Sequence, residues 1–570
     1  MGRKSNKTSI DIGAAEIGAV RKSWHGRLRV ALVYPNTYRV GMSNLGFQTV
    51  YRLLNEMAHV VCERAFLPDR PEGHGPVLSI ESGHPLKDFD VVAFSISFES
   101  DYPHLLDILA AAGIPAMSRD RSEVHPMVAA GGVACLLNPE PLAAFIDCFI
   151  LGEAEALLEP FFQRFDPERD RRDMLRALAV DLRGVYVPAF YAVQYHPDGT
   201  LRSFAPTEPV PEIIERGYAE PLPEPAASAV ITPHTTFDRT YLIEVGRGCP
   251  HGCRFCAAGY IYRPPRFHTA DRLRASMAAG AALTEKIGLV GAAVSDLPEI
   301  ASLCADYHDG STRVSFSSLR ADGLVPELLE TLRQSRVKTA TIAPDAGSER
   351  MRKVINKGMD EAAVLSAAET LVAGGIPNLK LYFMVGLPTE TAADVDAIVG
   401  MCRRIKHRFL QSSRTRGRMG DITVSLNSFV PKPVTPFQWA AMDEVGELKQ
   451  KIKRVKEGLR RMPNVRLHHD VPKHAYIQAL LSRGDRRVAT ILVGLQQNRG
   501  NWAKTLKASP VNADFYVLRE RDVGEMLPWD FIDHGIDRSF LAEEYRRALS
   551  GRASPPCPMQ ESCRMCGVCG

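Results

Sequence analysis

The sequence lacks three features that would place it in other classes of protein. No stretch reaches about 18 uninterrupted apolar residues, the length of a membrane-spanning helix, and no apolar run follows the basic residues at the start. The 70 Lys and Arg nearly balance the 66 Asp and Glu, and a charge of +4 is too small to imply a nucleic-acid partner. We therefore expect a soluble, cytoplasmic protein without a membrane partner.

The twelve cysteines are not spread through the chain, as they are in secreted disulfide frameworks. Three fall between positions 249 and 256, and four fall between 557 and 569. In a reducing cytosol such groups indicate metal binding. The length of 570 residues predicts several domains around more than one core.

The first part of the chain alternates strand-like and helix-like segments. Near-continuous apolar strands joined by helices predict a Rossmann-like parallel sheet in an α/β domain, with ligands at the carboxyl ends of its strands. Ser95, Ser97, Gly131 and Gly132 would lie there. We expect strands at 27–35, 89–97, 127–132 and 145–152, and helices at 45–57 and 102–113.

A second series of strands follows a proline-rich connection. Six repeats of strand and helix predict a partial (β/α)6 barrel with its site at the carboxyl ends of the strands. We expect these strands at 241–245, 287–294, 313–318, 338–344, 378–386 and 421–430. The predicted organisation is a leader (1–28), an α/β domain (29–165), a linker (166–236), the barrel (237–461), a small mixed or helical domain (462–550) and a Cys-rich tail (551–570).

The motif GRGCPHGCRFC carries the strongest chemical signal. Cys249, Cys253 and Cys256 form a Cys-x3-Cys-x2-Cys run just after the first barrel strand. A cubane iron–sulfur cluster normally takes four thiolates, so three leave one iron open to another ligand. The alternative is three cysteines buried as small apolar side chains.

This spacing, with an aromatic residue before the third cysteine, resembles the radical S-adenosylmethionine (SAM) superfamily. The resemblance implies a catalytic 4Fe-4S cluster on the three cysteines, whose open iron binds SAM, and electron transfer that cleaves SAM to methionine and a deoxyadenosyl radical. Although the usual Gly-Gly-Glu is missing, later motifs imply further SAM contacts. The implied cofactor-binding residues are Phe255, Gly291, Ser317, Arg320, Asp345 and Gly386. A surface ion pair is the alternative for Arg320.

The segment from 130 to 155 resembles the end of the cobalamin-binding domain that precedes many radical SAM cores. The resemblance rests on the Gly131-Gly132 turn and on a Gly-Glu-x-Glu sequence that begins at Gly152. A glycine pair at a strand end lets a bulky ligand approach the backbone. Asp-x-His-x-x-Gly, which supplies a histidine to cobalt, is absent from 29–165. Cobalamin either binds without a histidine ligand or the domain is a remnant.

Four cysteines close the chain in a Cys-x5-Cys-x2-Cys-x2-Cys run, namely Cys557, Cys563, Cys566 and Cys569. Four thiolates suffice for a tetrahedral zinc site or for an iron–sulfur cluster. The two successive x2 spacings favour a second 4Fe-4S cluster over zinc, and a mobile tail without metal is the third possibility.

The favoured function is a radical SAM enzyme that methylates or otherwise modifies an unactivated carbon with the help of cobalamin. A reductant such as ferredoxin or flavodoxin would be a partner. The first alternative is RNA modification by the same radical, with the basic stretches 403–418 and 449–461 on the polymer, although both also fit solvated helix faces. The second is a non-catalytic interaction protein that responds to cobalamin or redox state. The sequence does not identify the substrate.

Overall fold

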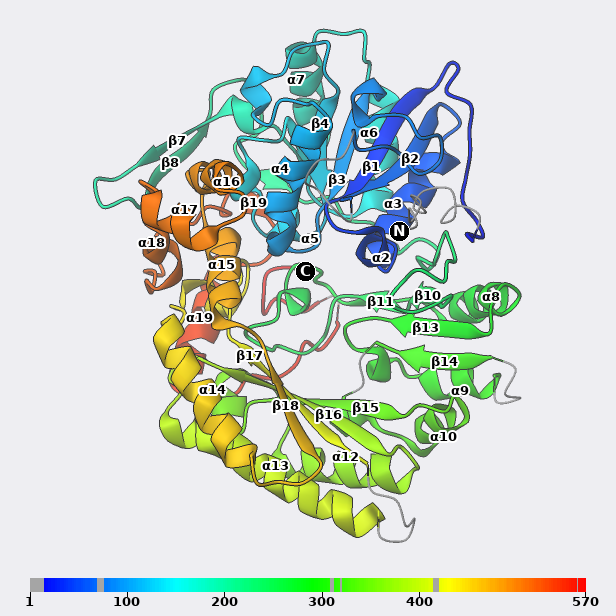
Figure 1. Cartoon of the computed structure of the whole chain (residues 1–570), viewed down its shortest axis with the longest axis vertical. Coiled ribbons are helices and arrows are strands. Elements are labelled where there is room, and N and C mark those ends of the chain that lie inside the picture. The colour runs from blue at the N-terminus through cyan, green and yellow to red at the C-terminus, as the bar shows by residue number, and fades with distance from the viewer. Residues whose placement is uncertain are drawn as a thin grey trace, which may run out of the picture. The chain divides into compact units, whose positions relative to one another are not determined.

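The computed structural model describes residues 15–68, 76–307, 312–317, 320–413, 420–560 and 562–569. The chain divides into two compact units (Figure 1). The first comprises residues up to 241 with 481–513 and 524–534, and the second comprises 242–480, 514–523 and 535–570. The segment predicted as a separate C-terminal domain, 462–550, is therefore shared between the two units.

The first unit contains the expected Rossmann-like sheet. Its six strands are ordered β2-β1-β3-β4-β5-β6, of which the first five are parallel and β6 is antiparallel. The four strands expected from the sequence are all present. The strands are β1 (Leu28–Tyr34), β2 (Val60–Phe66), β3 (Val91–Ser95), β4 (Met127–Gly131), β5 (Cys148–Ile150) and β6 (Val185–Tyr186).

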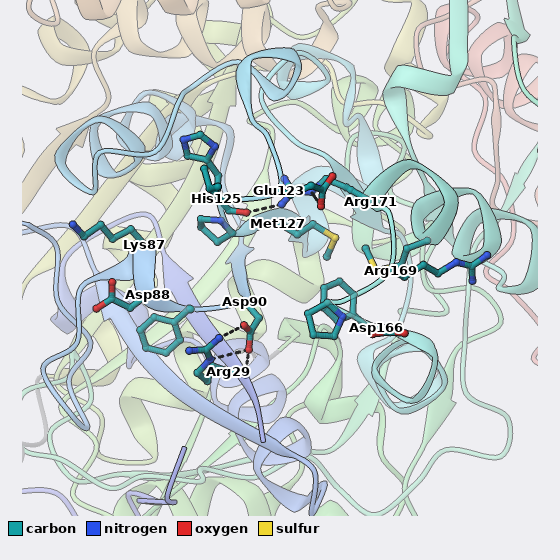
Figure 2. Close-up of a pocket in the computed structure, with 16 residues that line it drawn as sticks. Arg29, Lys87, Asp88, Asp90, Glu123, His125, Met127, Asp166, Arg169 and Arg171 are labelled. Carbon is teal, nitrogen blue, oxygen red and sulfur yellow. Dashed lines mark hydrogen bonds and ion pairs between the residues drawn. The ribbon is translucent and has the colours of Figure 1, made fainter. Parts of the chain in front are cut away.

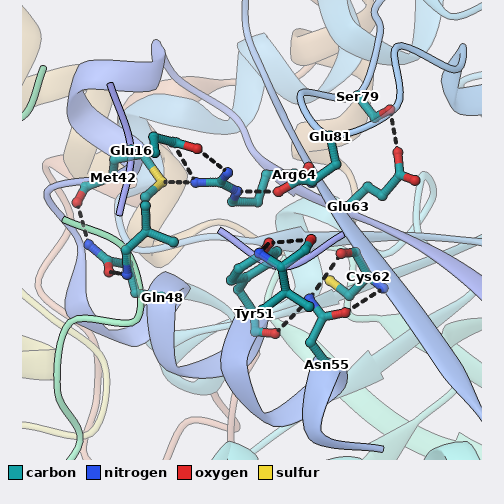
Figure 3. Close-up of polar contacts among 12 residues, drawn as sticks. Glu16, Met42, Gln48, Tyr51, Asn55, Cys62, Glu63, Arg64, Ser79 and Glu81 are labelled. Atoms are coloured by element: carbon teal, nitrogen blue, oxygen red, sulfur yellow. Dashed lines mark hydrogen bonds and ion pairs between the residues drawn. The ribbon is translucent and has the colours of Figure 1, made fainter. Parts of the chain in front are cut away.

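Strand β2 was not expected, because charged Glu63 and Arg64 interrupt its apolar run. Both side chains are nevertheless buried, since each has partners of its own (Figure 3). Arg64 donates from Nε to Glu81 at 2.6 Å and from Nη2 to Glu16 at 2.7 Å. Glu63 accepts hydrogen bonds from Trp24 at 2.6 Å and from Ser79 at 2.5 Å. Burial of a charge is tolerated where it is paired and hydrogen-bonded.

Helices surround this sheet. Helix α3 begins after Asn44, whose side chain accepts a bond from the main-chain N–H of Phe47 at 2.9 Å and so caps the helix. From the distant segment 481–513, α16 packs on α4, with Gln496 donating to the carbonyl of Leu106 at 3.2 Å. The helices are α2 (Tyr38–Gly41), α3 (Leu45–Glu56), α4 (Tyr102–Ala111), α5 (Val133–Leu137), α6 (Ala154–Arg164), α7 (Arg171–Asp181), α16 (Val488–Gln497) and α17 (Trp502–Ala508).

The segment predicted as a linker, 166–236, holds more regular structure than its prolines indicated. It contains helix α7, strand β6 and an antiparallel hairpin of β7 (Tyr191–Tyr195) and β8 (Leu201–Pro206). Its short strand β9 (Ile214–Glu215) pairs with β19 (Ile532–Asp533). The segment belongs to the first unit because these long-range pairings, which local composition does not reveal, hold it there.

The second unit contains all six strands expected for the barrel, but in the described residues they form two separate sheets and no closed barrel. One sheet has the order β10-β13-β14 and the other β15-β16-β17-β18. The last of these was not expected, because its sequence VRLHH is largely polar. The strands are β10 (Tyr241–Glu244), β13 (Lys286–Val290), β14 (Arg313–Phe316), β15 (Thr339–Asp345), β16 (Asn378–Val385), β17 (Ile422–Ser428) and β18 (Val465–His469).

Helices α12, α13 and α14 pack in series beside the four-stranded sheet (Figure 1). The helices of this region are α8 (Ala270–Ala281), α9 (Ile300–Ala305), α10 (Pro326–Gln334), α11 (Glu349–Val354), α12 (Glu361–Ala373), α13 (Ala392–Ser413), α14 (Val445–Leu459), α15 (Pro472–Arg483), α18 (Ala513–Val517) and α19 (Arg538–Leu549). None of the helices in the described ranges is long and apolar enough to cross a membrane.

Candidate active site

The three predicted cluster ligands share one tight loop after β10 and the two-residue strand β11 (Gly246–Arg247). The N–H of Cys256 donates to the carbonyl of Cys253 at 3.1 Å, and Cys253 is 8% exposed. Gly248 opens the loop with φ +83°, and a Cβ there would lie 2.7 Å from the carbonyl oxygen of Tyr262. Glycine is therefore required at this turn.

The three thiols are close enough to influence one another. Burial, together with the neighbouring Cys256 thiol, raises the pKa of Cys249 to about 11 and that of Cys253 to about 12. Within the described residues, no three His, Cys, Asp or Glu side chains are arranged to hold a single metal ion. The donor set itself has the right chemistry, because the irons of iron–sulfur clusters are ligated by cysteine thiolates. The donor set of three thiols thus fits a cluster with one open iron.

Arg254, between the second and third ligands, anchors the loop from inside. Its side chain is fully buried and donates from Nε to Glu544 at 3.0 Å. Its Nη1 donates to the carbonyls of Lys353 and Val354, at 3.0 Å each, and its Nη2 to the hydroxyl of Ser554 at 3.0 Å. The loop is therefore fixed to helix α11, helix α19 and the tail.

Three pairs of polar side chains lie near the thiols. Nε2 of His251 lies 2.5 Å from Asp296, and Arg320 donates to Asp322 at 2.8 Å. In the third pair, Nζ of Lys357 donates to the Asp345 carboxylate at 2.6 Å.

Lys357 and Arg320 are cations that interact electrostatically with the loop thiols. Burial acts against the charge of Lys357, but the Asp345 carboxylate raises its pKa, so it remains an ammonium ion. Both Lys357 and Arg320 interact electrostatically with Cys253. Arg320 does form the ion pair with Asp322 that was its alternative interpretation, but its side chain is only 13% exposed. Asp345 also holds φ +60°, an unusual backbone conformation of the kind that occurs at functional sites.

The remaining predicted SAM contacts are placed unevenly. Ser317 bonds reciprocally with the main chain of Gly291, at 3.1 Å to its N–H and 3.0 Å to its carbonyl. A Cβ on Gly291 would lie 2.8 Å from Val245, which precedes the cysteine loop. Phe255 is half-buried within that loop. Gly386 lies instead beside Glu390, which accepts from its N–H at 2.8 Å.

The sequence interpretation missed His251, Asp296, Lys357 and Asn356. His251 lies inside GRGCPHGCRFC, Asp296 follows Gly291 by five positions, and Asn356 and Lys357 follow Asp345 by 11 and 12 positions. The partners that these residues have in the folded chain are not visible in the sequence. The signal that could have found them is a charged or amide residue within about a dozen positions of a predicted site residue.

In the first unit, the second glycine of the predicted pair, Gly132, has a structural explanation. Gly131 ends β4, and Gly132 has φ +104°. A Cβ on Gly132 would lie 2.5 Å from the carbonyl oxygen of Ile96. Contact with the neighbouring strand therefore requires glycine here, whether or not a ligand binds.

Polar side chains gather where β1 and β3 end, the point at which the strand order reverses. Asn36 donates to Asp101 at 2.8 Å, and Asn44 donates to Ser97 at 3.0 Å. Phe98, directly after Ser97, is 58% exposed. In sheets with the order 2-1-3-4-5 this switch point is the usual ligand site.

A cavity of about 220 Å³ lies at the opposite, amino ends of β1, β3 and β4 (Figure 2). Arg29 donates to Asp90 there at 2.9 Å, and Lys87, Asp88 and Glu123 add charges of both signs. Ligands of parallel sheets bind at the carboxyl ends, so we assign this cavity no role.

The four tail cysteines lie in the second unit. Cys557, Cys563 and Cys566 line one cavity of about 330 Å³. Burial raises the pKa of Cys569, and the other three tail thiols raise it further. The tail thiols are thus neighbours.

Two family models match the chain. Residues 46–188 match the model described as "Radical SAM proteins, N-terminal", and residues 243–402 match "Radical SAM superfamily". The second segment contains the three loop cysteines and all the SAM contacts expected from the sequence. The first overlaps the domain expected to bind cobalamin.

Similar proteins include an uncharacterized protein of Methanocaldococcus jannaschii, MJ0966, which is 29% identical over 502 residues, or 87% of this chain and 97% of the relative. A tRNA-2-methylthio-N(6)-dimethylallyladenosine synthase of Sorangium cellulosum is 24% identical over 236 residues, 36% of this chain and 47% of the relative.

Two solved structures are also similar in part. The radical SAM methyltransferase TsrM from Kitasatospora setae, with cobalamin and a [4Fe-4S] cluster bound, gives a TM-score of 0.48 at 11% identity, over 85% of this chain and 100% of that one. The cobalamin-dependent SAM radical enzyme OxsB gives a TM-score of 0.43 at 16% identity, over 66% of this chain and 51% of that one. These likenesses are too weak to carry an argument about function. The two family models and the cysteine loop establish that the chain belongs to the radical SAM superfamily.

Proposed function

We propose that this radical SAM enzyme cleaves SAM reductively and, with cobalamin in its first unit, methylates or otherwise modifies an unactivated carbon. The observation that carries the radical chemistry is the loop of three neighbouring thiols inside the matched segment. A cluster bound there supplies the electron that cleaves SAM.

The chain's own residues hold and orient the reactants. Cys249, Cys253 and Cys256 ligate the cluster, and Arg254 keeps their loop rigid through its buried bonds. A carboxylate is best bound by a cation that is already held in place. We assign Arg320 to the methionine carboxylate of SAM. Its guanidinium is held by Asp322 and interacts electrostatically with Cys253.

Cobalamin is assigned to the β1–β3 switch point. Support comes from the strand order, from the polar groups of Asn36, Asn44 and Ser97, and from exposed Phe98, which offers an apolar surface to a flat ring. Gly132 adds no support, because its conformation is explained by contact with Ile96. We expect no protein histidine from the usual motif on cobalt.

RNA modification is the second candidate, favoured by the tRNA-modifying relative. Some cations of its predicted contact surfaces already pair with carboxylates. Arg408 pairs with Glu369 at 3.3 Å, and Arg404 and Arg454 pair with Glu361 and Asp396 at 2.5 Å each. Positions 414–418 of the first basic stretch lie outside the described residues. Salt-dependent binding of RNA would favour this candidate over a small substrate.

We extend the proposal to the tail, whose four thiols would hold a second iron–sulfur cluster, and to a one-electron reductant such as ferredoxin or flavodoxin. Zinc is the alternative metal for these thiols.

The decisive experiment is anaerobic incubation of the reconstituted protein with SAM and dithionite, followed by mass spectrometry for deoxyadenosine and methylated products. Replacement of Cys249, Cys253 and Cys256 by Ala should abolish deoxyadenosine. The matched control is Cys402→Ala, because Cys402 is a buried cysteine of α13 outside the loop. Wild-type protein that forms no deoxyadenosine would refute the proposal.

A further inference from the structure

The tail lies directly against the cysteine loop. The main-chain N–H of Cys557 donates to the carbonyl of Pro250 at 2.7 Å. Pro250 follows Cys249, so one hydrogen bond links the first tail cysteine to the residue next to the first loop cysteine. The two cysteine groups are more than 300 positions apart in sequence, between 249 and 557, yet they meet in one unit.

Asn356 clamps the same two segments together. It is 5% exposed, with φ +50°, and its Nδ2 donates to the carbonyl of Gly252 at 3.0 Å. Its Oδ1 accepts from the N–H of Ser554 at 2.8 Å. The Ser554 hydroxyl donates in turn to Glu544 at 2.6 Å. A buried network in which each of these groups has a partner favours a single arrangement.

The cavity beside this clamp has the chemistry of a metal centre. Three tail thiols line its volume of about 330 Å³ together with Gly252 of the loop. Among the described side chains, the tail cysteines are not drawn together around a point that would hold one ion. Zinc and the irons of a cluster both accept thiolates, and the two successive x2 spacings of the tail cysteines are the feature that favours a cluster over zinc.

We propose that the tail cluster is an electron relay to the cluster on Cys249, Cys253 and Cys256, and that Asn356 positions the two for transfer. The inference rests on the proposed function. A cluster held by the four tail thiols would accept one electron from a low-potential donor such as reduced flavodoxin. It would pass that electron across the segments joined by the Cys557–Pro250 bond to a cluster held by the loop thiols, so that the tail cluster would be reoxidised as the loop cluster is reduced. No other bond changes in this step.

The first test asks which metal the tail holds. Anaerobically reconstituted wild-type protein should contain about eight irons, and the double variant Cys563→Ser/Cys566→Ser about four, since each cubane holds four. The four irons that remain would also show that the variant folds around its loop cluster. In the fully reduced wild type, electron paramagnetic resonance should show magnetic broadening between two clusters, which the variant loses. Zinc in the wild-type tail would overturn the relay, because zinc has no redox chemistry.

The second test measures the relay itself. The absorbance of the loop cluster monitors its reduction by reduced flavodoxin. This reduction should be at least about tenfold slower in the tail variant, which is equivalent to about 1.4 kcal/mol in the barrier. Asn356→Gly keeps the left-handed backbone but removes both clamp bonds, so it should slow the same step. Asn464→Gly is the matched control, because Asn464 also has positive φ (+59°) but bonds to Gly420, away from the loop.

Dithionite separates this inference from the proposed function. As a small reductant it reaches the loop cluster directly, so both variants should still form deoxyadenosine with it. If the role of Asn356 is purely structural, Asn356→Gly should slow reduction of the loop cluster by flavodoxin and by dithionite to the same extent. Equal flavodoxin rates in wild type and tail variant would overturn the relay and leave SAM cleavage intact.

Discussion

Arg254 and Glu544 form a buried ion pair, with Nε of Arg254 3.0 Å from the Glu544 carboxylate, and it joins the cysteine loop to a helix near the end of the chain. Burial lowers the pKa of Arg254, and Glu544 opposes this effect. The conformation of the loop thus depends on residues 290 positions away.

Removal of Glu544 should therefore disrupt the loop. Glu544→Ala leaves the Arg254 charge buried without its carboxylate, which typically costs about 3–5 kcal/mol of stability. The midpoint of chemical denaturation and the yield of reconstituted loop cluster should both fall. Glu543→Ala is the control, since the neighbouring Glu543 is half exposed and pairs only at the surface with Arg546 and Arg547. If the two variants lose equal stability, the buried pair has no special role.

Gly132→Ala should destabilise the first unit more than an ordinary glycine substitution does. A left-handed conformation costs a non-glycine residue roughly 1–2 kcal/mol. Gly113→Ala, at φ +69° with open space around its Cβ, should show only that cost. Gly132→Ala should exceed it, because its Cβ would overlap the Ile96 carbonyl at 2.5 Å. Urea unfolding measures the difference, and equal midpoints would contradict the close contact.

Hydroxocobalamin added anaerobically should bind with a base-off absorption spectrum. Ser97→Trp should weaken binding at least about tenfold, or about 1.4 kcal/mol, because the indole would fill the switch point. Ser122→Trp places the same bulk near the amino ends of the strands and should bind normally. Wild-type protein that takes up no cobalamin at micromolar concentration, while still cleaving SAM, would make the first unit a scaffold or docking domain.

His534 should make the protein sensitive to acid. Its ring is buried, and burial lowers its pKa from 6.5 to about 3, with a further contribution from Arg216. The unfolded chain binds a proton below pH 6.5 while the folded chain does not. Stability is therefore complete above pH 6.5 and falls by up to about 1.4 kcal/mol per pH unit until about pH 3.

The variant His534→Leu checks this dependence. Its free energy of unfolding is measured by denaturant titration between pH 4 and pH 7. As the pH falls, this free energy should decrease less steeply than that of wild type, by up to about 1.4 kcal/mol per pH unit, which corresponds to one proton. Parallel curves for the two proteins would show that His534 is protonated equally in the folded and unfolded states.

Local patterns in the sequence predicted much of the fold. Apolar runs placed β1, β3 and β4, because a strand buried on both faces is apolar throughout. Segments rich in apolar and β-branched residues placed the six strands of the second unit, although several of these are buried on one face only. The cysteine loop could be recognised for a similar reason, since its ligands lie within eight consecutive positions, 249–256.

Tertiary structure decided what depends on partners distant in the chain. Strand β2 exists because Glu16 and Glu81 neutralise Arg64, and no local pattern reveals such a pairing. The segment 462–550 is shared between two units because strand pairing and helix packing draw its parts to different cores. The contact of Cys557 with Pro250 is likewise a property of the folded chain, because hydrogen bonds between remote residues form only once packing brings them together.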